Sequence, residues 1–268
     1  MVVACLLFQN LNAQISNSPY EDWDWKKDGI WAGTALLGSA YGLSLIINKD
    51  GISEQELDDI VSKQDDIFFM DRWVAGNNSV NSSNLSDFPF LISFGAPLIL
   101  LFDGHINDNT GQVMGYYLET MATTGALYGI TAGLVNRSRP YVYSEEVGLS
   151  RRLRNNAQRS FFSGHTAATA ASTFFVAKVY NDFYPDSPAL PYIWTAAATI
   201  PAAVGYLRMR SGQHFLTDVM VGYTVGALIG YYVPELHKKE NKLLTLSPVL
   251  GGNFYGENFN GMSFSYRF

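Results

Sequence analysis

The sequence predicts an all-α fold, a six-helix bundle with a short C-terminal β-hairpin-like tail, on three observations. Hydrophobic residues make up 47% of the 268 residues and charged residues only 16%, against about 25% charged residues in a typical soluble domain. Six apolar segments have helical length, are rich in Ala, Leu, Gly and Tyr, and show little strand-like alternation. The chain ends in a run from Met262 to Phe268 that alternates apolar and polar residues, as a strand does.

The six apolar segments predict the positions of the helices and are candidates for membrane-spanning helices. They cover residues 29–47, 88–102, 116–135, 166–180, 191–207 and 219–233. A membrane span needs about 20 mostly apolar residues, and only the first and fifth segments approach this without a formal charge. An integral membrane bundle and an exported bundle that is peripheral to the membrane are therefore both open.

The flanking regions predict three parts. Residues 1–14 are expected to form a signal segment, because an apolar run is followed by Ala13 where a signal peptidase would cleave. Residues 15–240 are expected to form the helical domain, and residues 241–268 a β-rich tail. Cys5 is the single cysteine, so an intrachain disulfide and a cysteine-based metal site are excluded.

The positive charge is concentrated in one stretch of an acidic chain. The net charge is −6, which argues against a nucleic-acid partner bound through a basic surface. Eight of the ten arginines nevertheless lie between positions 137 and 210. Because the planar guanidinium group suits phosphate and carboxylate oxygens, this focus predicts an anion site.

Three clusters contain side chains that can bind anions or transfer protons. Two of these clusters lie at the ends of predicted helices. Arg139 precedes Pro140, which disfavours helix for the residue before it, so Arg139 is expected where the third segment ends. Ser163, Gly164 and His165 directly precede the fourth segment. A glycine turn and free N–H groups at a helix N-terminus together favour phosphate.

The third cluster leads into the sixth segment. It contains Arg208, His214 and Asp218. His214 and Asp218 are four residues apart, so on a helix they share a face and the carboxylate can hold the imidazole N–H. A neutral imidazole oriented in this way is a nucleophile. His105 and His237 lie outside the clusters and are expected at the surface or in loops.

The order and spacing of the three clusters resemble the motif of the type 2 phosphatidic acid phosphatase (PAP2) superfamily, which includes bacterial class A acid phosphatases and vanadium haloperoxidases. The family pattern is Lys-x6-Arg-Pro, Pro-Ser-Gly-His and Ser-Arg-x5-His-x3-Asp. The resemblance covers roughly residues 116–233, and the layout of six apolar segments is similar too. The chain departs from it at three positions, with Ala132 for the lysine, Phe162 for the proline and Leu207 for the serine. Loss of the lysine removes one phosphate contact.

The resemblance implies a metal-independent phosphatase that needs no cofactor and hydrolyses a phosphomonoester or diphosphate. It implies His214 as the nucleophile that forms a phosphohistidine, Asp218 as the group that fixes its tautomer, and His165 as the acid and base. The implied phosphate-binding residues are Arg139, Arg208, Ser163 and Gly164, with Arg137 as a further candidate in place of the lysine.

The implied substrate is a lipid phosphate or a small phosphoester, handled at a membrane of the cell envelope with the site on the extracytoplasmic, periplasm-facing side. Two other functions are open. The implied phosphate-binding residues can also bind vanadate, as in a vanadium-dependent haloperoxidase. The loss of the lysine at Ala132 also fits a non-catalytic envelope protein with a degenerate site.

Overall fold

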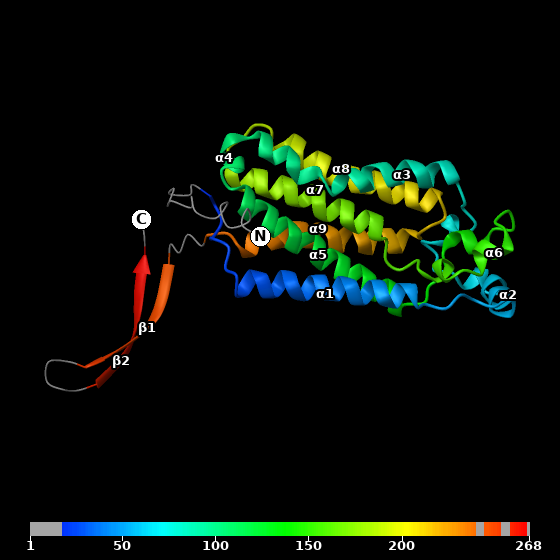
Figure 1. The fold of residues 1–268 in the computed structure, drawn as a ribbon, viewed down its shortest axis with the longest axis horizontal. Helices are drawn as coiled ribbons and strands as arrows, with labels where there is room; N and C mark the ends of the chain where they lie inside the picture. Colours follow the sequence, from blue (N-terminus) through cyan, green and yellow to red (C-terminus); the bar gives the residue numbers. More distant parts are fainter. Residues whose placement is uncertain (1–17, 240–243, 253–257, 267–268) are drawn as a thin grey trace, which may run out of the picture. The chain divides into compact units, whose positions relative to one another are not determined.

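A computed structural model describes residues 18–239, 244–252 and 258–266 of the chain. The chain divides into two compact units, one that ends at His237 and one that begins at Lys238. The described part of the first unit is helical (Figure 1). Its α-helices are α1 (Lys27–Ile47), α2 (Glu54–Ser62), α3 (Val80–Ser93), α4 (Gly104–Asn107), α5 (Thr110–Leu134), α6 (Leu149–Arg152), α7 (Gly164–Phe183), α8 (Leu190–Arg210) and α9 (Leu216–Leu236). Short 3₁₀ segments cover Gln64–Asp66, Arg72–Val74, Ala96–Phe102, Pro140–Tyr143 and Asn155–Gln158.

The predicted helical body is confirmed, but the described helices are more numerous than the six expected. The six apolar segments fall on α1, α3 with the 3₁₀ segment 96–102, α5, α7, α8 and α9. The additional short helices lie in the polar stretches, where local caps stabilise them. Ser53 and Glu56, for example, form a capping box at the start of α2.

Helix α3 begins earlier than its apolar segment. The polar run before residue 88 lies outside the predicted apolar segments, yet α3 starts at Val80 because the Ser79 side chain accepts a hydrogen bond from the N–H of Ser82. Pro97 then lies in the 3₁₀ segment that follows. This early start brings the residues of α3 to the functional site described below.

Helix α7 lies inside the bundle and packs against α3, α5, α8 and α9, while α1 lies along α5 (Figure 1). The contact between α7 and α9 is close because α9 presents Gly222, Gly226 and Gly230 to it. A Cβ atom added at Gly226 would overlap the carbonyl oxygen of Ala167. Small residues therefore fix the separation of α7, which carries His165, and α9, which carries Asp218.

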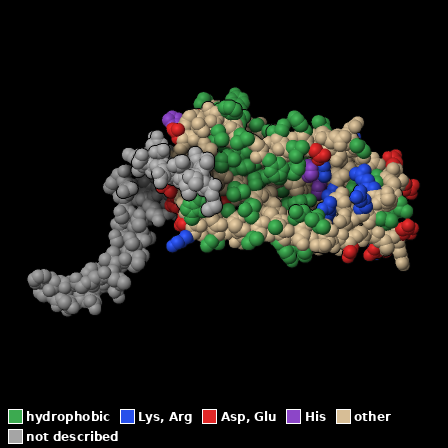
Figure 2. Space-filling view, in the orientation of Figure 1, with side chains coloured by type: hydrophobic (Ala, Val, Ile, Leu, Met, Phe, Trp, Pro, Cys, Tyr) green, Lys and Arg blue, Asp and Glu red, His purple; other side chains and the backbone are tan. Residues whose placement is uncertain are grey.

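Two helices, α1 and α9, are long and apolar enough to cross a membrane by length and composition, and α3 with its bent 3₁₀ continuation forms a third candidate. Large apolar side chains are exposed along these helices, including Leu37 and Leu43 on α1 and Phe88 on α3. Figure 2 shows such side chains across the face of the bundle. Extended apolar surface of this kind points to membrane association.

The second unit contains β1 (Leu244–Gly252) and β2 (Asn258–Tyr266), which pair antiparallel with Leu244 opposite Tyr266 and Gly252 opposite Asn258. Most of the alternating run that begins at Met262 lies within β2. The expected signal segment 1–14 lies outside the described residues.

The expectation for His237 was wrong. Its side chain is buried, because α1 and α5 close over the end of α9 and the ring stacks on Tyr116 at a centroid distance of 4.1 Å.

Candidate active site

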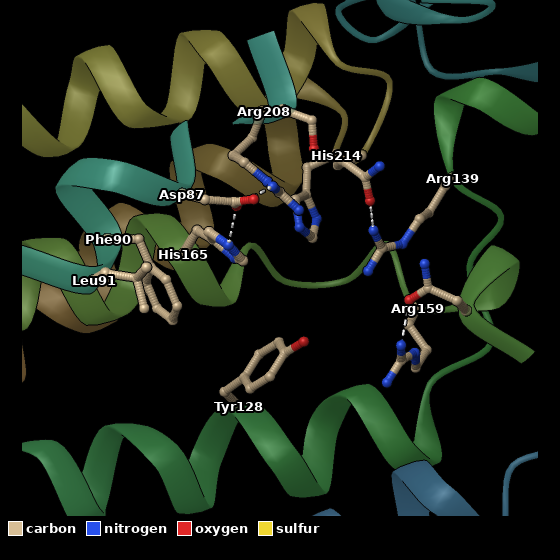
Figure 3. Close-up of a pocket in the computed structure, with 12 residues that line it drawn as sticks. Asp87, Phe90, Leu91, Tyr128, Arg139, Arg159, His165, Arg208 and His214 are labelled. Atoms are coloured by element: carbon tan, nitrogen blue, oxygen red, sulfur yellow. Dashed lines mark hydrogen bonds and ion pairs between the residues drawn. The ribbon is translucent and has the colours of Figure 1, made fainter. Parts of the chain in front are cut away.

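One cavity of about 490 Å³ contains four of the residues singled out in the sequence, Arg139, His165, Arg208 and His214. The helix ends bring them together. His165 is in the first turn of α7, Arg208 in the last turn of α8, and Arg139 follows α5 (Figure 3). The other residues that line the cavity are Ser83, Asp87, Phe90, Leu91, Tyr128, Asn156, Arg159 and Gln213.

Backbone contacts hold Arg139 and His214 in place. Arg139 has extended backbone angles (φ −76°, ψ 152°), as expected before Pro140, and its N–H donates to the carbonyl oxygen of Ala157 at 2.8 Å. His214 lies in the loop that joins α8 to α9, where its N–H points to the carbonyl oxygen of Arg208. Both side chains are almost completely buried.

The imidazole of His214 is held as a neutral ring. Its Nδ1 lies 2.6 Å from the carbonyl oxygen of Ser160, which can only accept, so Nδ1 carries the proton. Burial lowers the pKa of His214 well below its ordinary value, and the charges of Arg139 and Arg208 lower it further. The ring is therefore uncharged at neutral pH, with the lone pair on Nε2.

The expected contact between His214 and Asp218 was wrong. Helix α9 begins at Leu216, so His214 precedes the helix and the spacing of four does not place the two side chains on one helical face. Asp218 instead accepts from the Ser160 hydroxyl at 2.5 Å and from the N–H of Phe215 at 2.8 Å. It thus holds Ser160, the residue whose carbonyl oxygen orients His214.

Arg137 lies outside the cavity, which corrects its candidacy as a phosphate ligand. Its guanidinium group pairs with the carboxylates of Asp218 and Asp71, and the distance to Asp71 is 2.7 Å. Both carboxylates are buried. Arg137 therefore neutralises the acidic groups behind His214.

Ser163 and Gly164 lie at the start of α7, and neither lines the cavity. The Ser163 hydroxyl is buried and lies 2.8 Å from that of Thr166. Gly164 is packed against the Tyr128 ring, which a Cβ atom at this position would approach to 2.7 Å.

Asp87 is the functional residue that the sequence analysis missed. Its Oδ1 lies 3.0 Å from Nε2 of His165 and 3.3 Å from Nη1 of Arg208. The His165 ring is stacked on Phe90, with ring centroids 4.0 Å apart. Asp87 and Phe90 both come from α3. Asp87 lies just before the predicted apolar segment 88–102, so the hydrophobic pattern did not point to it.

Burial and the charge of Arg208 also lower the pKa of His165. Burial is the main cause that lowers its pKa to about 4, and the charge of Arg208 adds to this, while Asp87 acts in the opposite direction. The free site therefore holds two neutral imidazoles. A phosphate dianion next to Arg208 would offset that positive charge and raise the pKa of His165.

Three guanidinium groups around the cavity carry unused donors. Within the described part of the chain, the buried Nε atoms of Arg139, Arg159 and Arg208 have no hydrogen-bond partner. Burial lowers the pKa of Arg139 and Arg208, the latter to about 10, and the proximity of the two guanidinium groups adds to the shift of Arg208. Buried cations with unpaired donors require an anion.

The sequence comparisons agree with this geometry. Residues 114–242 match the sequence model of the PAP2 superfamily, a range that includes α7, α8, α9 and most of α5. The match covers the motif residues from Arg139 to Asp218, and over this range it confirms the resemblance to the PAP2 superfamily.

Among curated proteins, the chain is similar to the lipid A 4'-phosphatase of Porphyromonas gingivalis, with 30% identity over 77 residues. The match covers 29% of this chain and 29% of the relative's length. No solved structure matches the chain significantly.

Proposed function

We propose that the chain is a phosphatase that hydrolyses a lipid phosphate through a phosphohistidine intermediate on His214. The observation that carries the proposal is the set of three guanidinium groups with unpaired donors around a neutral, oriented imidazole. The family and the relative's name support the same reaction class.

In the first half-reaction, Nε2 of His214 attacks phosphorus and the bond from phosphorus to the ester oxygen breaks. His165 gives its proton to that oxygen, which leaves as an alcohol. In the second half-reaction, His165 takes a proton from water, the resulting hydroxide attacks phosphorus, and the bond to His214 breaks. Asp87, 3.0 Å from Nε2 of His165, favours the protonated ring that serves as the acid.

The phosphate oxygens are bound by the arginines of the cavity. Arg139 and Arg208 donate to the equatorial oxygens and stabilise the charge that develops in the transition state. Ser163 and Gly164 do not line the cavity, and they act through the first turn of α7, which carries His165. The guanidinium groups supply the positive charge of the site, so the proposed reaction needs no metal ion or other cofactor.

Arg159 takes the place of the lysine that the PAP2 pattern has at Ala132. Ala132 is completely buried, and its carbonyl oxygen accepts a hydrogen bond from Lys49 at 2.9 Å. Arg159 lines the cavity and has a buried, unpaired Nε among the described residues. The third cation of the site thus comes from the segment before α7 instead of from α5.

An apolar groove beside the cavity indicates a lipid substrate. It has a volume of about 640 Å³, lies between α3, α7 and α8, and shares Leu91 with the phosphate cavity. It is lined by Leu91, Ile92, Gly95, Ala96, Ile99, Thr173, Val176, Ile193, Ala196, Ala197 and Ile200. A hydrocarbon chain can lie in this groove while its phosphate group lies among the arginines.

The proposal places the site at the extracytoplasmic face of a cell-envelope membrane, with α1 and α9 as the helices that hold it there. It is tested by incubation of the purified protein with an aryl phosphate and a panel of lipid phosphates. Phosphate release that the wild type shows and His214→Ala lacks supports the proposal, and no release from any substrate overturns it.

In a further assay, the protein is incubated with vanadate, peroxide and halide, and oxidation of the halide is measured. Halide oxidation without phosphate release would favour a haloperoxidase. Binding of phosphate or vanadate without any turnover would favour a non-catalytic protein.

A further inference from the structure

A second group of functional side chains lies at the other end of the bundle. Asp28 is in the first turn of α1, Glu119 is on α5, and His237 directly follows α9. The length of α9 alone separates this group from Asp218 by about 28 Å. Figure 1 shows the start of α1 and the end of α9 at the same end of the bundle.

The three side chains are buried and converge on one point. Their exposed fractions are 1%, 0% and 2%. Nε2 of His237 lies 3.2 Å from Oδ1 of Asp28 and 3.3 Å from Oε2 of Glu119. One ligand atom from each residue lies within 4.8 Å of the other two.

The carboxylate of Glu119 lacks hydrogen-bond donors in the described part of the chain, although the charge of Lys27 in the first turn of α1 acts on it. Both carboxylate oxygens of Glu119 are buried and lack a hydrogen-bond partner among the described residues. The buried Lys178 is already paired with Asp182 and Glu235. Two carboxylates that face one imidazole in a buried site need more positive charge than a protonated histidine supplies.

The orientation of His237 fits a metal ligand. Its Nδ1 lies 2.7 Å from the carbonyl oxygen of Val233, so Nδ1 carries the proton and Nε2 is directed at the carboxylates. In histidines that bind a metal through one ring nitrogen, the other ring nitrogen donates a hydrogen bond to a group such as a backbone carbonyl oxygen, and this bond orients the ring. Asp28 is also held, because its Oδ2 accepts from the N–H of Asp24 at 2.8 Å.

We propose that Asp28, Glu119 and His237 bind one divalent transition-metal ion, with Zn²⁺ as the ion that suits them best. Two oxygens and one imidazole nitrogen are donors that Zn²⁺ accepts, whereas Mg²⁺ and Ca²⁺ prefer oxygen alone. Zinc bonds of about 2.0–2.1 Å place tetrahedral ligand atoms about 3.3 Å apart, which matches the two distances from Nε2. The ion joins α1, α5 and α9 and leaves one coordination position for water.

The test uses the full-length protein, stripped with a chelator and then equilibrated with ZnCl₂. We expect about one bound zinc per chain by mass spectrometry, and a thermal unfolding midpoint that rises with zinc. Glu119→Gln and Asp28→Asn, which keep the side-chain shape, should each weaken zinc binding at least tenfold. His105→Ala, which removes an exposed histidine, should leave it unchanged.

Two further measurements separate this site from the phosphate cavity and from misfolding. Zinc binding should survive in His214→Asn and in the presence of inorganic phosphate. Co²⁺ in place of zinc should give visible absorption bands that are lost in Asp28→Asn. Circular dichroism shows whether Glu119→Gln and Asp28→Asn are folded. If one of them fails to fold, the zinc affinity of the other tests the proposal.

Failure of the stripped wild type to take up zinc would overturn the proposal. The same conclusion would follow if folded Glu119→Gln and Asp28→Asn bound zinc as tightly as the wild type. Neither result would bear on the proposed phosphatase activity.

Discussion

At the scale of single residues, a chain of contacts holds His214 in position. Arg137 and the Ser160 hydroxyl hold Asp218, and the Ser160 carbonyl oxygen holds Nδ1 of His214. Burial and two nearby arginines then keep the ring neutral. The nucleophile is thus positioned by a backbone group, and Asp218 acts on it through Ser160.

The sequence predicted the four residues that share the cavity but not all of their contacts. Arg139, His165, Arg208 and His214 could be found because each stands beside a helix end marked by proline, glycine or a change of composition. Asp87 could not, because its link to His165 spans 78 residues of sequence. Such a contact depends on the packing of α3 against α7 and α8.

Arg159 is expected to bind the transferred phosphate. Arg159→Ala should lower kcat/KM for a lipid phosphate at least tenfold, about 1.4 kcal/mol of transition-state stabilisation, because it removes a guanidinium group whose buried Nε has no partner among the described residues. Steady-state kinetics measure the effect. Arg154→Ala removes an exposed arginine outside the cavity and should leave kcat/KM unchanged. Equal effects of the two substitutions would contradict the role of Arg159.

Asp87 is expected to set the pH dependence of turnover. Its carboxylate raises the pKa of His165 against the effects of burial and Arg208, so Asp87→Asn should lower that pKa. Because His165 must carry a proton to act as the acid, the alkaline limb of the kcat profile should move to lower pH. The shift should be clear with a poor leaving group and small with a good one. An unmoved alkaline limb with both substrates would contradict this role.

At the scale of the helices, hydrophobic runs predicted where the elements lie but not where they begin. The apolar segment 219–233 falls within α9, which begins at Leu216 and ends at Leu236. In contrast, α3 begins in a polar run because of the Ser79 cap. Caps are local hydrogen bonds that hydropathy does not register.

Gly226 is expected to hold α9 against α7. Gly226→Leu should destabilise the fold by about 1–3 kcal/mol, because the new side chain would overlap the carbonyl oxygen of Ala167. Gly33→Leu is the matched control, since a Cβ atom at this position on α1 has no neighbour within 4 Å among the described residues. Thermal unfolding in detergent measures both. A midpoint that falls equally in the two variants would refute the packing argument.

At the scale of the whole molecule, the first unit joins a polar site to an apolar surface. Figure 2 shows histidine and basic side chains beside a face rich in hydrophobic side chains. The groove that meets the cavity at Leu91 provides a path between the two. This arrangement allows a phosphate headgroup to reach the arginines while its hydrocarbon part stays in an apolar environment.

The groove is expected to select lipid substrates. Ala196 lines it and is exposed to it from α8, so Ala196→Trp should fill part of the space for a hydrocarbon chain. The KM for a lipid phosphate should rise at least fivefold, while kcat/KM for a small aryl phosphate should stay within a factor of two. Parallel kinetics on the two substrates provide the check. A similar loss on both would show that the groove does not hold the chain.

The proposed transfer of the phosphoryl group to His214 is tested by trapping the intermediate. The protein is mixed with a radiolabelled phosphate ester, quenched in alkali and digested, and the labelled peptide is identified by mass spectrometry. We expect acid-labile label on the peptide that contains His214, and neither label nor turnover in His214→Asn, which keeps a donor toward Ser160 but lacks Nε2. Sustained phosphate release by His214→Asn at the wild-type rate would contradict the account.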